Sequence, residues 1–543
     1  MELTRGIDEA PNKVSNSPAQ THAYHAVFEV APYSSPIDHP GHHHDRCSMS
    51  FITTRYYDPA ITTRCDHVGQ MMRIHVLPDD VLLEIFEVFM LIMKPSWGVD
   101  KRGVESWQSL VHVCRRWRNL VFESPRRLNL QLFCTPETRA KETLHVWPAF
   151  LPLIVKGNMD VSSRTDNVIS ALEQTNRVRQ VDLYLEAWQL AAVLGSMQVS
   201  FPELTNLRLW SLGETRVIPD SFLGKSAPHL RILHFYSIPF PGLPKLLLTA
   251  THLVQLYLHC IPHSGYISPK TMAALVSVLS RLESLHLEFP SPLSRPDWES
   301  QNMPSSERSV LPALHEFCFK GFTEYLEEFV TDIDTPELDR MEITFFNQVD
   351  FDCPRLVQFI DGTPIILRAL DEAHVQFHYS TASVALRYRT SKPGSNDLRI
   401  NISNREPDWQ PSSLAQVLDS SLPPRALSMV EDLYIKYHYW QTIWEDDAIE
   451  NTLWLELLHP FTAVKNLYIS REFAPGIGAA LQELVDSGIT EMLPSLQNVF
   501  VEELMLSGLF QENIRQFVAA RQFSNHPITI SVWDKYSDSR WSI

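Results

Sequence analysis

The chain has 543 residues, a formal net charge of −18 at pH 7 and a sequence pI of about 5.6. Hydrophobic residues make up 44% and charged residues 20% of the chain, which is typical of a globular protein rather than a disordered one, and the length predicts two or three domains. Because the acidic excess repels phosphate backbones, the composition argues against nucleic acid as the principal partner.

The cysteines predict neither a disulfide framework nor a zinc knuckle. They are odd in number, scattered and without a Cys-x-x-Cys pair: Cys47, Cys65, Cys114, Cys134, Cys260, Cys318 and Cys353. The most apolar stretch, 81–93, is too short for a membrane span and contains Glu84 and Glu87. We therefore expect a soluble, intracellular protein of the cytoplasm or nucleus, with no membrane partner.

Residues 1–70 show no sustained periodicity and are rich in His, Pro, Ser and Thr, so we expect a disordered leader. The run His42-His43-His44 could chelate a metal ion, but it lacks the fixed ligand spacing of a structural site. The sequence therefore predicts no metal site and no cofactor.

From Ile74 the pattern changes to short amphipathic helices. Leu77-Pro78-Asp79-Asp80 is typical of a helix start, because proline suits the first turn and carboxylates favour the positive end of the helix dipole. One apolar face is expected from Val81, Leu82, Ile85, Phe86 and Phe89. After a polar loop from Lys94 to Ser106, a second helix is expected to carry Leu110, Val113, Cys114, Trp117 and Val121 and to end at Ser124-Pro125.

These residues resemble the F-box motif, and more narrowly the F-box proteins of mushroom-forming fungi. The matching features are Leu77-Pro78, Ile85-Phe86 and the segment from Val113-Cys114 to Trp117, within roughly residues 74–125. The connection from Lys94 to Ser106 is longer than is usual in that family. Two such short helices cannot bury much surface alone, so their apolar faces need the next domain or an external partner.

The resemblance implies docking on the Skp adaptor of a Skp–cullin–F-box ubiquitin ligase, and through the adaptor on cullin. It implies these adaptor-binding residues: Leu77, Pro78, Leu82, Ile85, Phe86, Val113, Cys114 and Trp117. A cluster of arginines could complement an acidic adaptor or simply be a solvated face: Arg115, Arg116, Arg118, Arg126 and Arg127.

Beyond Asp166 the chain repeats a unit of three apolar residues, in which two spacers separate the first pair and one spacer the second pair. The copies are Leu204/Leu207/Leu209, Leu230/Leu233/Phe235, Leu253/Leu256/Leu258, Leu282/Leu285/Leu287, Leu314/Phe317/Phe319, Leu338/Met341/Ile343, Val430/Leu433/Ile435, Val464/Leu467/Ile469 and Leu496/Val499/Val501. Weaker copies begin at Leu370 and Leu398, and an earlier strand is expected at 181–185. Interruptions are expected at 290–309 and 380–397.

Proline two residues ahead of many units predicts a turn into each strand, and helical segments such as Ser268 to Leu279 lie between the strands. The pattern resembles a degenerate leucine-rich repeat, a solenoid of strands and helices. The expected α/β organisation is a leader (1–70), an F-box (71–127), a connecting segment (128–165), a leucine-rich-repeat-like solenoid (166–532) and a tail (533–543).

In such a solenoid the spacer side chains line a concave surface that binds an unidentified protein target. The spacer positions hold Arg208, Trp210, His234, Tyr236, Tyr257, His259, His286, Glu288, Lys320, Glu342, Tyr434, Lys436 and Tyr468. Each of them could also be only an exposed, tolerant position.

No convincing reaction centre is present in the sequence. Gly476-Ile477-Gly478-Ala479-Ala480-Leu481 follows an expected strand as a dinucleotide loop would, but Leu481 replaces the third glycine. The hypothesis is therefore a non-catalytic substrate receptor of a ubiquitin ligase. The alternatives are a scaffold that binds the adaptor without ubiquitination and an enzyme hidden in the solenoid.

Overall fold

The computed structural model describes residues 74–92, 106–158, 164–213, 217–240, 245–291, 308–346, 351–367, 370–378, 381–388, 398–403, 410–437, 451–486, 492–502, 508–523 and 526–533. All of them belong to one compact unit, residues 74–543. The expected leader and the loop at 93–105 lie outside the described residues, and so do residues 292–307 and 389–397 of the expected interruptions at 290–309 and 380–397.

The unit opens with a group of short helices. They are η1 (Ile74–Val76), α1 (Asp79–Ile92), α2 (Ser106–Val111) and α3 (Arg115–Glu123). The second helix expected from the sequence is two helices, because the chain breaks before Cys114, whose sulfur caps α3 by accepting from the Trp117 backbone N–H. Capping groups satisfy donors that the first helical turn leaves unpaired.

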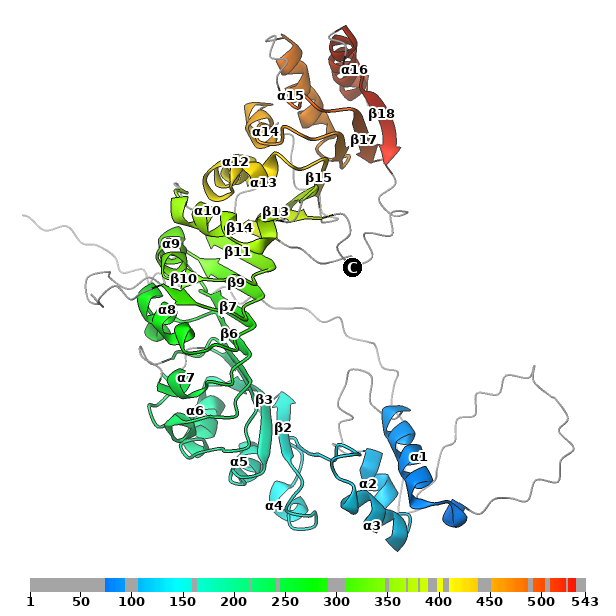
Figure 1. Cartoon of the computed structure of the whole chain (residues 1–543), viewed down its shortest axis with the longest axis vertical. Coiled ribbons are helices and arrows are strands. Elements are labelled where there is room, and N and C mark those ends of the chain that lie inside the picture. Colours follow the sequence, from blue (N-terminus) through cyan, green and yellow to red (C-terminus); the bar gives the residue numbers. More distant parts are fainter. Residues whose placement is uncertain are drawn as a thin grey trace, which may run out of the picture. The chain divides into compact units, whose positions relative to one another are not determined.

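A mixed sheet of 16 strands follows, and it has the architecture of a leucine-rich-repeat-like solenoid (Figure 1). Its strands up to β11 are β1 (Leu132–Cys134), β2 (Leu153–Asn158), β3 (Val178–Glu186), β4 (Asn206–Leu212), β5 (Ile232–Tyr236), β6 (Gln255–His259), β7 (Ser284–Glu288), β9 (Glu316–Gly321) and β11 (Arg340–Phe346). The remaining strands are β12 (Glu372–Phe377), β13 (Thr381–Arg387), β14 (Leu398–Ser403), β15 (Asp432–Tyr437), β16 (Asn466–Ile469), β17 (Asn498–Glu502) and β18 (Thr529–Trp533). A separate parallel pair joins β8 (Ser309–Val310) to β10 (Ile333–Asp334).

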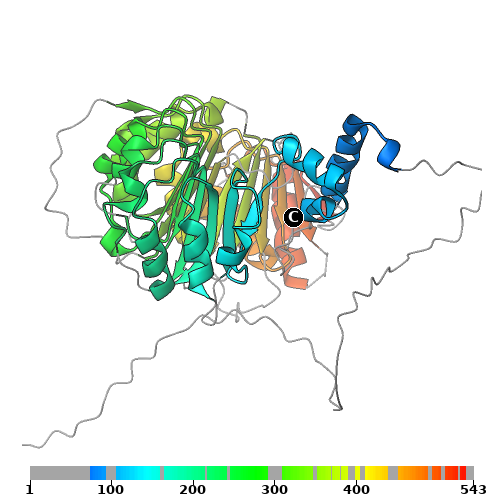
Figure 2. The same cartoon turned by 90° about the horizontal axis from the view of Figure 1, so that it is seen from below.

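The helices between the strands lie along one side of the row of strands, outside the strands in the view of Figure 2. They are α4 (Ala140–Thr143), α5 (Thr165–Leu172), α6 (Ala187–Ser196), η2 (Phe222–Lys225), α7 (Lys245–Thr249), η3 (His263–Gly265), α8 (Pro269–Ser277), α9 (Thr323–Thr331) and α10 (Pro354–Asp361). The last are α11 (Pro364–Leu367), α12 (Gln410–Ser421), α13 (Pro424–Leu427), α14 (Asn451–Leu458), α15 (Ala474–Asp486) and α16 (Gly508–Phe523).

Each predicted repeat unit forms a strand whose apolar residues are buried beneath these helices. The first apolar residue ends a turn: the Leu204 N–H donates to the Phe201 carbonyl, and the Leu230 N–H donates to the Ala227 carbonyl. Pro202 and Pro228 stand second in these turns, where a fixed φ near −65° is favourable. The strand positions and the proline turns predicted from the sequence are therefore confirmed.

Two features of the sheet differ from the sequence-based expectation. First, β1 and β2 lie within 128–165, expected as a connecting segment; β1 pairs in parallel with β2, and β2 pairs in parallel with β3. Second, the strand order runs β11-β14-β13-β12-β15, so β13 occupies part of the expected interruption at 380–397 and pairs antiparallel with both neighbours. The parallel progression of the solenoid is reversed locally at this point.

Candidate functional site

The helical motif is held together by aromatic packing. The rings of Phe86 on α1 and Trp117 on α3 meet edge to face with 4.7 Å between centroids. Leu82 and Phe86 are fully buried. Trp107 on α2 is also buried, and its Nε1 donates to the Gln131 carbonyl at 3.0 Å, just before β1. These contacts join the motif's helices to one another and to the start of the sheet.

Three members of the arginine cluster bind groups of the motif itself. The Arg116 guanidinium pairs with Asp79 and donates from Nη2 to the Leu77 carbonyl at 2.7 Å. Arg127 pairs with Glu84, and its Nε donates to Glu87 at 2.8 Å.

The third, Arg118, donates from Nε to the Val111 carbonyl at 3.0 Å. Arg116 thus binds the start of α1, Arg127 its middle and Arg118 the end of α2. This leaves the exposed Arg115 and Arg126 as candidates for an external acidic partner.

An apolar stripe remains exposed on α1. Val81, Ile85, Val88 and Ile92 are 41%, 40%, 53% and 73% exposed. Their spacing of four, three and four residues places them on one face of the helix, roughly a quarter to a third of a turn round from Leu82 and Phe86. Exposed large apolar side chains that share one face mark an interaction site more often than scattered ones.

The residues implied to bind an adaptor fall into three groups. Pro78, Ile85, Val113 and Cys114 are exposed, Leu77 and Trp117 are half-buried, and Leu82 and Phe86 are buried. Leu82 and Phe86 are corrected to core residues, since their side chains already pack inside the motif. Sequence reasoning missed Val88 and Ile92, although they continue the periodicity that starts at Val81.

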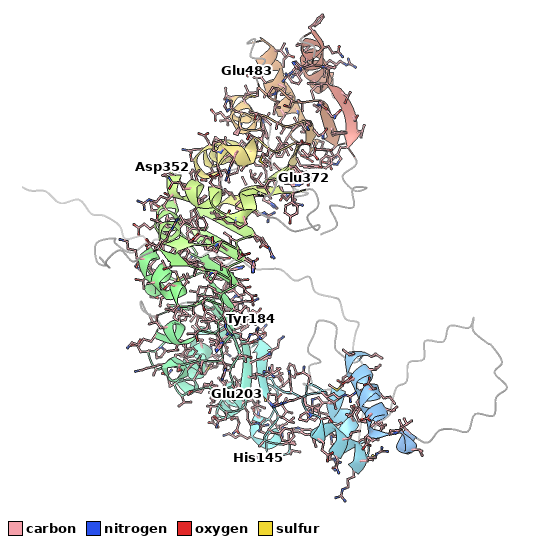
Figure 3. The ribbon with its side chains drawn as sticks, viewed as in Figure 1. His145, Tyr184, Glu203, Asp352, Glu372 and Glu483 are labelled. Atoms are coloured by element: carbon pink, nitrogen blue, oxygen red, sulfur yellow. The ribbon has the colours of Figure 1, made fainter. Side chains whose placement is uncertain are left out.

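The spacer residues of β4 to β9 lie on the sheet face opposite the helices, which we call the open face. Strand register aligns them in two rows. The inner row is Arg208, His234, Tyr257, His286 and Cys318, and the outer row is Trp210, Tyr236, His259, Glu288 and Lys320. Glu342 continues the inner row on β11. In Figure 3, Tyr184 lies on this strand side, whereas Asp352 and Glu483 lie on the helix side.

Aromatic rings are in contact along these rows. Tyr184 stacks on Trp210 with 4.4 Å between centroids and 9° between planes, and Trp210 contacts His234 at 4.6 Å. Farther along, Tyr257 meets His286 edge to face at 4.2 Å. Rings with polar edges offer a rigid surface of the kind enriched at protein interfaces.

Ionisable groups shape the electrostatics at the centre of the open face. Burial, together with the nearby His259 and Arg208, lowers the pKa of His234 to about 3. Burial alone would raise the pKa of Glu288, but the His259 imidazole, 2.9 Å away through Nδ1, together with the nearby positive charges, lowers it. At neutral pH the centre of this face therefore holds the uncharged imidazole of His234 near the ionised carboxylate of Glu288.

On the C-terminal strands the rings form a continuous parallel stack. His374, Tyr434, Tyr468 and Phe500 follow one another at 4.5, 4.2 and 4.5 Å between centroids, with planes within 11° of parallel. Tyr434 is fully buried.

Lys436 is also buried, and its Nζ lies 5.0 Å from the centre of the Tyr434 ring and 4.9 Å from that of Trp533. Tyr434 and Lys436 are thus structural members of the stack rather than exposed target-binding residues, while Tyr468 remains half-buried.

A groove of about 1130 Å³ runs along the edge where β3 to β7 begin. Its lining includes Arg126, Arg179, Arg231 and Arg281, together with Glu203, which is labelled in Figure 3. The backbone of this edge is regular: the Thr205 N–H donates to the Arg179 carbonyl, and the Arg231 N–H donates to the Thr205 carbonyl. The exposed arginines suit carboxylates or other anions.

The glycine motif considered as a dinucleotide loop lies inside α15. Gly476 packs against Trp454, because a Cβ at this position would lie 2.9 Å from the Trp454 Nε1 atom. A dinucleotide loop needs its first glycines before the helix, where backbone N–H groups approach the phosphates. The packing explains Gly476 without a nucleotide.

In the part of the chain that the structure describes, no helix has both the length and the apolar character needed to span a membrane.

Neither a protein-family model nor a curated protein matches this chain. Among solved structures, the leucine-rich repeat-containing protein LegL7 of Legionella pneumophila is 11% identical, with a TM-score of 0.25, and the match covers 72% of this chain and 97% of LegL7. A chain of the Rad7 and Elc1 complex of yeast is 11% identical, with a TM-score of 0.27, and the match covers 78% of this chain and 88% of that one.

Proposed function

We propose that this chain is an F-box substrate receptor of the type found in mushroom-forming fungi, whose helices α1 to α3 dock on the Skp adaptor of a cullin ubiquitin ligase. The observation that carries the proposal is the exposed stripe Val81, Ile85, Val88 and Ile92, on a motif whose sequence resembles an F-box. A helix face laid into an apolar groove is a common recognition mode. Complete burial of one fully exposed side chain of this size contributes about 1.5–3 kcal/mol to the binding free energy, and a side chain that is already partly buried contributes less.

The open face is the proposed target-binding surface, because its two rows present aromatic rings and mixed charges on a rigid sheet. The groove lined by Arg126, Arg179, Arg231 and Arg281 is a proposed binding site for an acidic segment of the target. The chain then contributes proximity, holding target lysines near a ubiquitin-conjugating enzyme that is recruited elsewhere in the complex. The reaction itself takes place on other subunits.

Co-purification tests this function. The tagged chain should capture the Skp adaptor and cullin, and the double variant Ile85→Ala/Val88→Ala should lose both. The matched control is Val199→Ala/Leu212→Ala, which removes two exposed apolar side chains from the repeats and should retain both partners.

Capture of the adaptor without cullin would favour the scaffold alternative. Failure of the unaltered chain to capture the adaptor would refute the F-box assignment.

A further inference from the structure

Three potential metal ligands converge on the open face, on neighbouring strands. His286 lies on β7, and Glu316 and Cys318 lie on β9, where Cys318 is the register partner of His286. A ring nitrogen, a carboxylate oxygen and the Sγ atom all lie within 4.8 Å of one another. The sheet backbone fixes this convergence, since residues two apart on a strand point to the same side.

Two of the ligand groups, the imidazole of His286 and the carboxylate of Glu316, face each other. Nε2 of His286 is buried, has no hydrogen-bond partner among the described residues and lies 3.7 Å from Oε2 of Glu316. The other carboxylate oxygen, Oε1, accepts from Arg340 at 3.1 Å, while the Ser284 hydroxyl donates to Oε2 at 3.1 Å. These contacts orient the carboxylate, as the outer partners of a metal ligand do.

We infer that His286, Glu316 and Cys318 form a binding site for a divalent transition-metal ion of the Zn²⁺ class. Imidazole, carboxylate and thiolate are the ligands that Zn²⁺ takes in proteins, and a thiolate with a carboxylate balances its charge. Binding displaces the Cys318 thiol proton to solvent and forms the metal–sulfur bond. Three protein ligands leave the fourth tetrahedral position to water, on the side that the helices do not cover.

This site is independent of the proposed adaptor docking, and its ion would link β7 to β9. The sequence alone predicts no metal site here, because the ligands do not form a Cys-x-x-Cys or His-x-x-x-His pattern: 29 intervening residues separate His286 from Glu316. Only the strand register reveals the convergence.

The test is titration of the purified full-length chain with Co²⁺, a spectroscopic substitute for Zn²⁺. The background variant His42→Ala/His43→Ala/His44→Ala/Cys47→Ser removes the competing ligands of the N-terminal histidine run. In this background we expect one equivalent of Co²⁺ to give a thiolate-to-cobalt charge-transfer band, and Zn²⁺ to abolish it by displacement.

The variants assign the band to these residues. Cys318→Ser should abolish the band and weaken Zn²⁺ binding at least about 100-fold, since even outer-sphere changes cost about 10–100-fold. Glu316→Gln should keep the band but require more Co²⁺, and the control Cys114→Ser, which removes an exposed thiol, should change neither. A background chain without the band, or a band that survives Cys318→Ser in a folded chain, would overturn the assignment.

Discussion

The ring of Phe86 on α1 lies edge-on against the indole of Trp117 on α3, with 4.7 Å between their centroids, while the preceding residue, Ile85, has 40% of its surface exposed. Adjacent residues of a helix are about 100° apart around its axis, and here that rotation separates a buried side chain from an exposed one. The inward residue holds the helical motif together, and the outward one is available to a partner. This division separates folding from binding and makes the two roles testable by single substitutions.

Phe86→Ala should unfold the helical motif locally. Truncation of a fully buried phenylalanine costs about 3–5 kcal/mol, because contacts are lost and a cavity remains. We expect amide hydrogen exchange in α1 and α3 to accelerate, while β4 to β9 keep their protection. Ile85→Ala should leave exchange in both regions nearly unchanged. Equal protection in Phe86→Ala and the unaltered chain would contradict the packing described for this ring.

A pair of glycine substitutions should change stability in opposite directions. Gly476→Ala places a methyl group 2.9 Å from Trp454 Nε1, so we expect a loss of about 1–3 kcal/mol through overpacking. Gly195, inside α6, has no atom within 4 Å of an added Cβ, so Gly195→Ala should stabilise the chain by up to about 1 kcal/mol. Denaturant unfolding measures both; a stabilising Gly476→Ala would refute the contact with Trp454.

Stability should fall as the pH is lowered below about 6.5 because of His234. Burial, with Arg208, His259 and His286, keeps the folded-state pKa near 3 against the opposing pull of Glu288, whereas the unfolded residue titrates near 6.5. Between these values the unfolded state binds more protons, so protonation favours unfolding.

We expect His234 to account for about 1 kcal/mol lost between pH 7 and pH 5, after allowance for screening by solvent. Thermal unfolding of the metal-free chain at both pH values measures the loss, and His234→Gln should reduce it. The same pH dependence in the variant would contradict a neutral, buried His234.

Tyr434 and Tyr236 should respond differently to truncation. Tyr434 is buried in the C-terminal stack, so Tyr434→Ala should lower stability by about 3–5 kcal/mol, as for other large aromatic truncations. Tyr236 is exposed on the outer row, and Tyr236→Ala should change stability by less than about 1 kcal/mol. Chemical denaturation followed by circular dichroism distinguishes them, and equal losses would contradict the assignment of Tyr434 to the core.

The sequence predicted the regular part of the fold well, because each repeat carries its own signals. Leu204, Leu207 and Leu209 identify the buried side of a strand, and Pro202 identifies the turn before it. The reversed segment was not predictable in the same way. Ala382, Val384 and Leu386 alternate as strand residues do, but alternation does not specify which neighbour a strand pairs with or in which direction.

The candidate sites were predicted only in part, because periodicity does not tell which of two apolar faces is covered. On α1 both faces are apolar, and only packing against Trp117 shows that Phe86 points inward and Ile85 outward. Burial of Lys436 depends in the same way on the distant Trp533. Convergence of Cys318 with His286 depends on strand register, which no local pattern reveals.

The most direct test of the proposed function is the affinity of the purified chain for the Skp adaptor, measured by calorimetry for the unaltered protein and for Ile85→Asp/Val88→Asp. Charges placed in an apolar interface should weaken binding at least about 100-fold, a loss of the size seen when interface hot-spot residues are substituted. The melting temperature should stay unchanged. Binding by the variant within about twofold of the unaltered chain, or no binding by the unaltered chain, would contradict docking through the α1 stripe.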